Sequence, residues 1–161
     1  MDALGNAVHA YLSLDYANLN DDEQLKVAER ILKNWGMDSF IDASEVLKAG
    51  NNFQKYIDER YDNYKAYKEW PIFIRNEENQ VIQGWIDMLL ETEEGYVLID
   101  HKDYPGSNPE DRAKLYTPQL SAYKEAVEKS TGKPVIEILI HMPVKGIVLK
   151  LQEEENLVGA L

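Results

Sequence analysis

Cysteine is absent from this chain of 161 residues. Without thiols the chain cannot form disulfides, thiolate zinc sites, iron–sulfur clusters or a cysteine nucleophile. Any metal ion must therefore be held by carboxylate oxygens and imidazole nitrogens. Such ligands favour Mg²⁺ or Mn²⁺, which keep several waters and bind substrate phosphates.

Basic residues are scarce, since 17 Lys and Arg face 29 Asp and Glu and leave a formal net charge of −12. A surface of this charge repels polyanions and anionic membranes, so any contact with nucleic acid must be local. Long apolar segments are missing too, because no run approaches the roughly 18 apolar residues of a membrane span. The N-terminus also lacks the pattern of a signal peptide. We therefore expect a cytoplasmic protein with no membrane partner.

A phosphate-binding loop of the G-x-x-x-x-G-K-[ST] type is lacking as well. Gly132-Lys133 has neither the upstream glycine nor the following hydroxyl. The chain therefore encodes no ATP-driven motor. Its 44% hydrophobic content is enough for a folded core, and it shows neither an internal repeat nor a linker. The sequence predicts a single domain over residues 1–161.

Segments with the apolar spacing of amphipathic helices fill the N-terminal part of the chain. They span 2–16 and 21–35, and the second begins with acidic residues and stops at Gly36. A third helical region covers residues 43–67, and we expect it to break at the turn-like cluster 50–52.

The periodicity then changes to that of strands, with β-branched and aromatic residues separated by polar turns. The first three strands predict an antiparallel meander. The order of elements predicts an α/β chain of the mixed α+β type, with a mixed sheet and helices around it. The predicted segments are strands at 69–75, 80–91 and 96–102, a helix at 117–130, and strands at 135–142 and 146–152.

Two acids of the meander face each other in one register. Side chains alternate along a strand, so Asp100 and Lys102 project from one face and His101 from the other. If the hairpin turns at residues 93–94, Asp87 falls opposite Asp100. A slip by one residue would place Asp87 on the other face, so this prediction depends on the turn.

Asp100 interrupts an apolar strand, where a carboxylate is costly, and a second acid opposite it adds repulsion. A divalent cation would offset that cost. Lys102 could then orient or activate a water, or stabilise charge at a phosphate. The spacing alone leaves open an alternative, a surface ion pair between Asp100 and Lys102.

Four short motifs occur in a defined order between residues 5 and 123. In that order they resemble the PD-(D/E)xK nuclease superfamily, and more narrowly the RecB/AddA-type nuclease domain at the C-terminus of bacterial helicase–nucleases. Four ordered motifs are far more specific than a lone D-x-K. The motifs are Gly5-Asn6-Ala7-Val8-His9, Gly84-Trp85-Ile86-Asp87, Asp100-His101-Lys102 and Gln119-Leu120-Ser121-Ala122-Tyr123.

The resemblance implies a role for each motif residue. The metal ligands would be His9, Asp87, Asp100 and the backbone carbonyl of His101. Lys102 would be the catalytic lysine beside the two aspartates. His101 stands where tyrosine is commoner in the family, and we expect little effect because only its carbonyl is implicated.

Three further positions follow from the same resemblance. Gln119 and Tyr123 lie one helical turn apart and would line the catalytic site and contact DNA. Glu69 fits another acidic position of the family whose role is less defined.

The resemblance also implies a restriction-endonuclease-like fold, with a central mixed sheet flanked by helices, and a Mg²⁺- or Mn²⁺-dependent deoxyribonuclease that hydrolyses phosphodiesters. The implied partners are DNA, single-stranded or unwound, and a helicase domain or subunit in recombinational repair. We expect the chain to be excised from the C-terminus of a longer helicase–nuclease. Because its net charge repels DNA, the isolated domain should cut poorly.

Two other functions stay open. One is a catalytically degenerate nuclease fold that serves DNA binding or scaffolding, although the retained motif residues argue against it. The other is an acidic protein-interaction domain without a nucleic-acid role, which the charge alone favours.

For several residues with ring side chains, packing in the core is an alternative to a functional role. His9, taken without the motifs, would be a packing residue beside an apolar helix stripe, and His141 in an apolar strand is predicted to belong to the core. Four tyrosines are spaced nearly as a helical stripe and could stack on unpaired bases, but packing is favoured. They are Tyr56, Tyr61, Tyr64 and Tyr67.

The segment 103–116 is too long for a simple connection. Arg112 and Lys114 within it are among the few cations near the predicted site. We therefore expect a lip that guides a DNA strand, with an ordinary surface loop as the alternative.

Overall fold

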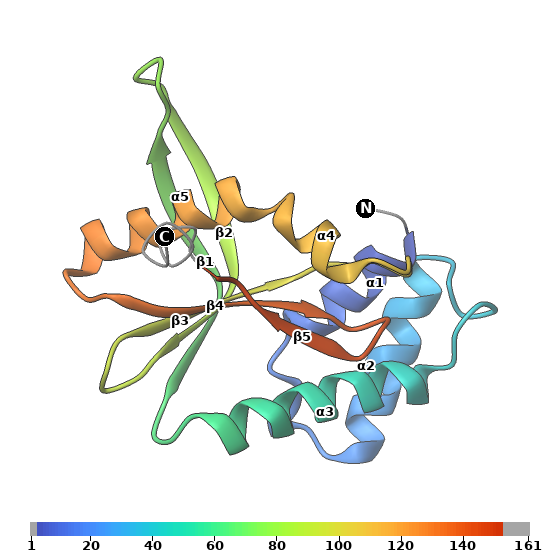
Figure 1. Ribbon diagram of the computed structural model, residues 1–161. Coiled ribbons are helices and arrows are strands. Elements are labelled where there is room, and N and C mark those ends of the chain that lie inside the picture. Colours follow the sequence, from blue (N-terminus) through green and yellow to red (C-terminus); the bar gives the residue numbers. More distant parts are fainter. Residues whose placement is uncertain (1–2, 153–161) are drawn as a thin grey trace.

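A mixed sheet of five strands forms the centre of the protein (Figure 1). This computed structural model describes residues 3–152. The strands lie in their order along the chain; only the β3–β4 pair is parallel, and the other pairs are antiparallel. The mixed α+β fold predicted from the sequence is therefore confirmed. The strands are β1 (Lys65–Arg75), β2 (Val81–Glu91), β3 (Tyr96–His101), β4 (Val135–Met142) and β5 (Ile147–Lys150).

Helices cover both faces of this sheet (Figure 1). On one face, Phe53 of α3 packs against Val97 and Ile99 of β3. On the other face, Leu120 of α5 packs against Leu98. The helical elements are α1 (Ala3–Leu12), the 3₁₀ turn η1 (Tyr16–Asn18), α2 (Asp21–Asn34), α3 (Ala43–Arg60), α4 (Pro109–Lys114) and α5 (Thr117–Thr131).

Local sequence signals explain where two of the helices begin and end. The side chain of Asn20 caps α2 by accepting a hydrogen bond of 2.9 Å from the amide of Glu23. Pro118 lies in the first turn of α5, and Gly132 ends that helix in the left-handed region with φ 72°. Among residues 3–152, none of the helices has the length and apolar character needed to cross a membrane.

The third helix differs from the prediction at both its middle and its end. α3 continues through Gly50 without a break, because this glycine lets two tyrosines approach the helix. A Cβ at Gly50 would lie 2.9 Å from the ring of Tyr11, and the Tyr16 hydroxyl donates to the Gly50 carbonyl at 3.0 Å. The helix also stops at Arg60, so residues 65–67 belong to β1 rather than to a helix.

The four tyrosines predicted to pack are indeed used in packing. Tyr61 is buried in the cluster between α3 and the sheet, and Tyr56 and Tyr64 are partly buried against it. Tyr67 is partly buried on the opposite side of the sheet. Their helical spacing is therefore accidental, because they belong to α3, the following loop and β1.

The pairing of β2 with β3 matches the predicted register. Leu89 is paired with Leu98, and Met88 with Ile99. The amide of Thr92 donates to the carbonyl of Gly95 at 2.9 Å and closes the turn. The ladder ends at Met88 and Ile99, and the next residues of the two strands, Asp87 and Asp100, lie close enough for the charge of one to act on the other.

Candidate active site

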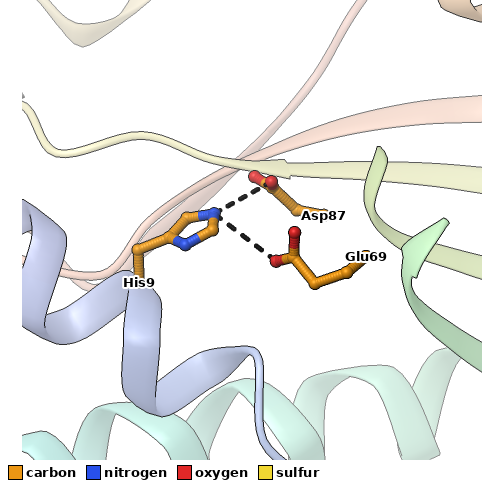
Figure 2. Close-up of side chains that lie close together, drawn as sticks. All are labelled: His9, Glu69 and Asp87. Atoms are coloured by element: carbon orange, nitrogen blue, oxygen red, sulfur yellow. Dashed lines mark hydrogen bonds and ion pairs between the residues drawn. The ribbon is translucent and has the colours of Figure 1, made fainter. Parts of the chain in front are cut away.

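The approach of α1 to the sheet brings together a compact group of three side chains of the types that can hold a metal ion (Figure 2). His9 Nε2 lies 2.9 Å from Asp87 Oδ1 and 4.0 Å from Glu69 Oε1. One ligand atom from each of these three residues falls within 4.8 Å of the others. Three separate elements, α1, β1 and β2, therefore contribute an imidazole and two carboxylates, a donor set suited to a divalent cation.

An irregularity in β1 accompanies this group. Glu69 has φ 51°, in the left-handed region that few residues with a side chain adopt. The ladder pairs the residues on either side, Lys68 with Met88 and Trp70 with Ile86, and omits Glu69 with Asp87. The regular pairing is thus interrupted at the two carboxylates.

Lys68 ties α1 to β1 directly beside Glu69. Its ammonium donates to the backbone oxygens of Leu12, at 3.0 Å, and Leu14. These carbonyls lie at the C-terminal end of α1 and two residues beyond it, where a cation is favourable. Burial lowers the pKa of Lys68. The lysine therefore anchors the end of the helix that carries His9.

Asp87 is held by two hydrogen-bond donors. His9 donates to Oδ1, and the amide of His101 donates to Oδ2 at 2.8 Å. Burial by itself would raise the pKa of Asp87, but these bonds and the neighbouring imidazoles outweigh it and lower the pKa. The same hydrogen bond raises the pKa of His9. Asp87 therefore remains ionised, and a metal ion that takes the His9 nitrogen must displace a proton.

Asp100 stands next to Asp87 in a different environment. Its Oδ2 atom lies 3.1 Å from Lys102 Nζ, and the two side chains are only 7% and 20% exposed. The ion pair named in the alternative interpretation is therefore present, but it is largely buried rather than on the surface. Burial and then the charge of Asp87 raise the pKa of Asp100 to about 7. Within the described residues, Asp100 Oδ2 also accepts no hydrogen bond of good geometry.

The structure gathers a set of possible ligands that differs from the one the motifs indicated. His9 and Asp87 lie together as expected, but Glu69 is the third member of the compact group. Asp100 lies beside Lys102 instead. The assignment of His9, Asp87, Asp100 and the His101 carbonyl as ligands stays a prediction.

Behind the strand ends, the ring of His101 contacts His141. Their Nδ1 atoms are 2.9 Å apart, and the His141 ring stacks on Phe53 with ring centroids 4.1 Å apart. Both histidines are buried, which lowers the pKa of His101 to about 4 and that of His141 well below its usual value. The predicted core position of His141 is confirmed.

Gln119 and Tyr123 lie on α5, and the Tyr123 ring lies against Gly84 at the start of the second motif. Gln119 Nε2 donates to the Tyr123 hydroxyl at 3.2 Å. A Cβ at Gly84 would lie 3.0 Å from that hydroxyl, so the glycine admits the tyrosine. The two motifs thus touch three residues before Asp87, and a DNA-contacting role for Gln119 and Tyr123 stays a prediction.

The segment 103–116 contains α4 and two tyrosines that pack near the site. Lys102 Nζ lies 4.7 Å from the centroid of the Tyr116 ring. The guanidinium of Arg112 lies 5.9 Å from the same ring and 5.6 Å from that of Tyr104. Lys114, in contrast, forms an exposed pair with Asp111. A role as a lip for DNA stays a prediction.

Two residues of this site carried little or no signal in the sequence. Lys68 anchors α1, and Tyr116 covers Lys102, yet neither belongs to a motif. Their roles depend on which elements the fold brings together. Glu69 did carry a signal, because it stands at the start of the predicted strand 69–75 and fits a further acidic position of the resembled family.

The chain belongs to the PD-(D/E)XK nuclease superfamily, whose sequence profile matches residues 1–158. The family expected from the four motifs is therefore confirmed, together with the nuclease class that its description names. The central mixed sheet flanked by helices agrees with the fold expected for that family.

Similar proteins include several that are named as subunits of an ATP-dependent helicase/nuclease. The one from Clostridium acetobutylicum is 29% identical over 92% of this chain and 14% of its own length. Those from Thermoanaerobacter sp. and Bacillus cereus are 41% and 34% identical over 53% and 55% of this chain, and over 7% and 8% of their own lengths. These matches confirm the narrower resemblance to helicase–nucleases. The chain spans only about a seventh of the Clostridium relative.

Proposed function

We propose that this chain is a divalent-metal-dependent DNA nuclease that hydrolyses phosphodiester bonds. The observation that carries the proposal is the compact group of His9, Glu69 and Asp87 next to the buried pair of Asp100 and Lys102. Membership of the nuclease superfamily supports the reaction class.

The residues fit a Mg²⁺ or Mn²⁺ ion. The available donors are hard oxygens and one imidazole. Asp100 is a buried acid whose pKa is raised by burial and by the charge of Asp87, so a cation beside the two carboxylates would be favourable. A bound ion would lower the pKa of a water molecule and polarise a phosphate. We assign His9, Asp87 and Asp100 as ligands, with Glu69 as a further candidate.

Lys102 is the proposed catalytic lysine. Its ammonium is held between the Asp100 carboxylate and the face of the Tyr116 ring, so its position is restricted. From there it can orient a water molecule or stabilise negative charge that develops on a phosphate. Gln119 and Tyr123 would contact the DNA from α5.

We also propose that the chain works with a helicase. The similar proteins carry helicase and nuclease in one name, and this chain matches a small part of them. A helicase domain or subunit would supply single-stranded or unwound DNA, which a protein of net charge −12 captures poorly by itself. The setting we propose is recombinational DNA repair in the cytoplasm.

The test is cleavage of 5′-labelled single-stranded and duplex DNA by the purified chain in Mn²⁺, Mg²⁺ or EDTA. Wild-type protein should cut in a metal and not in EDTA, and Lys102→Ala should cut roughly 10²- to 10⁴-fold more slowly. Lys55→Ala is the matched control, because Lys55 lies in an exposed ion pair with Glu59 on α3 and belongs to no part of the proposed site. Wild-type-like cutting by Lys102→Ala would contradict the proposal. DNA binding without cleavage in every metal would favour a degenerate binding module.

A further inference from the structure

The hairpin of β1 and β2 extends beyond the rest of the molecule (Figure 1). Pairing across the ladder places Pro71 with Trp85 and Phe73 with Gln83, so their side chains share one face of this arm. Phe73 is 66% exposed and Trp85 is 51% exposed. The opposite face differs, because there Ile72 is buried in the core cluster that includes α5. The outer face of the arm, defined by Phe73, Trp85 and their partners, thus presents two aromatic rings to solvent.

The charge of this outer face is unusual for the chain. Arg75 is paired with Val81 on the same face, and it is the one charged side chain among the six residues of these three pairs. Its guanidinium is bonded to the carbonyl of Asn79, which holds the cation at the outer end of the arm. In a protein of net charge −12, these three pairs contain none of the acids that would repel a polyanion.

The outer face also leads to the candidate active site. Trp85 precedes Asp87 by two residues on β2, and Pro71 follows Glu69 by two residues on β1. A strand lying along the arm would therefore reach the carboxylates at its base. The tyrosines that could have stacked on bases, Tyr56 and Tyr61 among them, are instead occupied in packing.

We propose that the outer face of the β1–β2 arm binds single-stranded DNA, with unpaired bases stacked on Trp85 and Phe73 and the backbone near Arg75. The inference rests on the proposed nuclease function and adds where the substrate lies. Aromatic faces stack on any base, so this surface suits a nuclease without sequence preference. Bases in a duplex are already stacked on each other, so the surface selects unpaired strands.

Binding is measured by fluorescence anisotropy of labelled oligothymidylate and of a duplex, in EDTA so that no cleavage occurs. The variants are Phe73→Ala, Trp85→Ala and the double substitution, with Trp85→Phe as the conservative change. Trp35→Ala is the control, because Trp35 is also exposed but caps α2 away from the arm. We expect the double variant to bind oligothymidylate about tenfold or more weakly, Trp85→Phe to retain most binding, and Trp35→Ala to match wild type.

A second measurement separates this inference from the proposed function. Wild-type and double-variant proteins are assayed in Mn²⁺ on oligothymidylate and on bis(p-nitrophenyl) phosphate, a diester too small to reach the arm. The ratio of kcat/KM for the oligonucleotide to that for the small diester should fall about tenfold in the double variant. If wild type hydrolyses neither substrate, the proposed nuclease function is refuted. The anisotropy measurement still tests whether the outer face of the arm binds single-stranded DNA. Unchanged oligothymidylate affinity in the double variant overturns the inference, and a loss of affinity only for a helicase partner would assign the face to protein contact.

Discussion

Asp87 and Asp100 lie side by side on neighbouring strands, yet their carboxyl groups behave in opposite ways. Both are shielded from solvent, with side-chain exposures of 13% and 7%. Hydrogen bonds from His9 and the His101 amide overcome burial and lower the pKa of Asp87. Asp100 has only the Lys102 ammonium against its burial and the charge of Asp87, and its pKa rises to about 7. The protein itself stabilises the ionised form of Asp87, whereas a cation would stabilise the ionised form of Asp100.

The largest expected effect on stability comes from substituting Asp87, the acid that has hydrogen-bond donors within the protein. Asp87→Asn removes the charge of the acceptor to which His9 and the His101 amide donate, and weakening these two charge-assisted hydrogen bonds costs about 3 kcal/mol of unfolding free energy. Urea unfolding at neutral pH in EDTA measures this loss. The control is Asp111→Asn, since that residue forms an exposed ion pair and should change stability by less than about 0.5 kcal/mol. Equal stability of the two variants would contradict the role given to Asp87.

A bound metal ion should stabilise the folded protein through the carboxylates of both Asp87 and Asp100. A cation that binds only the folded protein stabilises it by about 2.7 kcal/mol when its concentration is about a hundred times Kd. We expect Mn²⁺ to raise the Tm of wild type in thermal unfolding followed by circular dichroism. The rise should disappear in the Asp87→Asn, Asp100→Asn double variant. An equal rise in that variant would show that the ion binds elsewhere.

Substitution of Asp100 is expected to change the stability in the opposite direction, toward a more stable protein. Its pKa is higher in the folded than in the unfolded chain, so without metal the wild type loses stability as pH rises from about 4 through about 7. Asp100→Asn removes this loss and should stabilise the protein by about 2 kcal/mol near pH 8, with little difference near pH 4. Urea unfolding in EDTA at both pH values measures it. A variant less stable than wild type at the higher pH would refute this account of Asp100.

The smallest effect on stability is expected for Lys68, which anchors the end of the helix that carries His9. Lys68→Met keeps the apolar stem but loses the bonds to the carbonyls of Leu12 and Leu14, at a cost of about 1 kcal/mol. Because α1 carries His9, the Mn²⁺-dependent rise in Tm should shrink more than the basal stability does. Lys65→Met on the same strand is the control, since Lys65 lies at the exposed start of β1. An undiminished response to Mn²⁺ would argue that α1 is positioned without this lysine.

The part of the site predicted best from sequence was the hairpin. The register that places Asp87 beside Asp100 followed from turn position and strand alternation, and both are local properties. The predicted metal set was less complete, because Glu69 joins His9 and Asp87 through an irregular backbone conformation that no motif encodes.

The predicted break in the third helix failed for a tertiary reason. Gly50 was interpreted as a helix break, but the structure uses it inside α3 to admit Tyr11 and Tyr16. In an isolated sequence a glycine followed by two asparagines favours a turn. Packing of two aromatic rings against the helix outweighs that local preference.

The sequence by itself determined the kind of chemistry available. The lack of cysteine restricts the donors to oxygen and imidazole, and the spacing around Asp100 and Lys102 puts both on one strand face. Such features depend on composition and on neighbours a few residues away. The tertiary structure alone decided that His9 reaches Asp87, 78 residues further along the chain, and that two adjacent acids have opposite pKa shifts. Those outcomes depend on burial and on distances between elements, which only the packed fold defines.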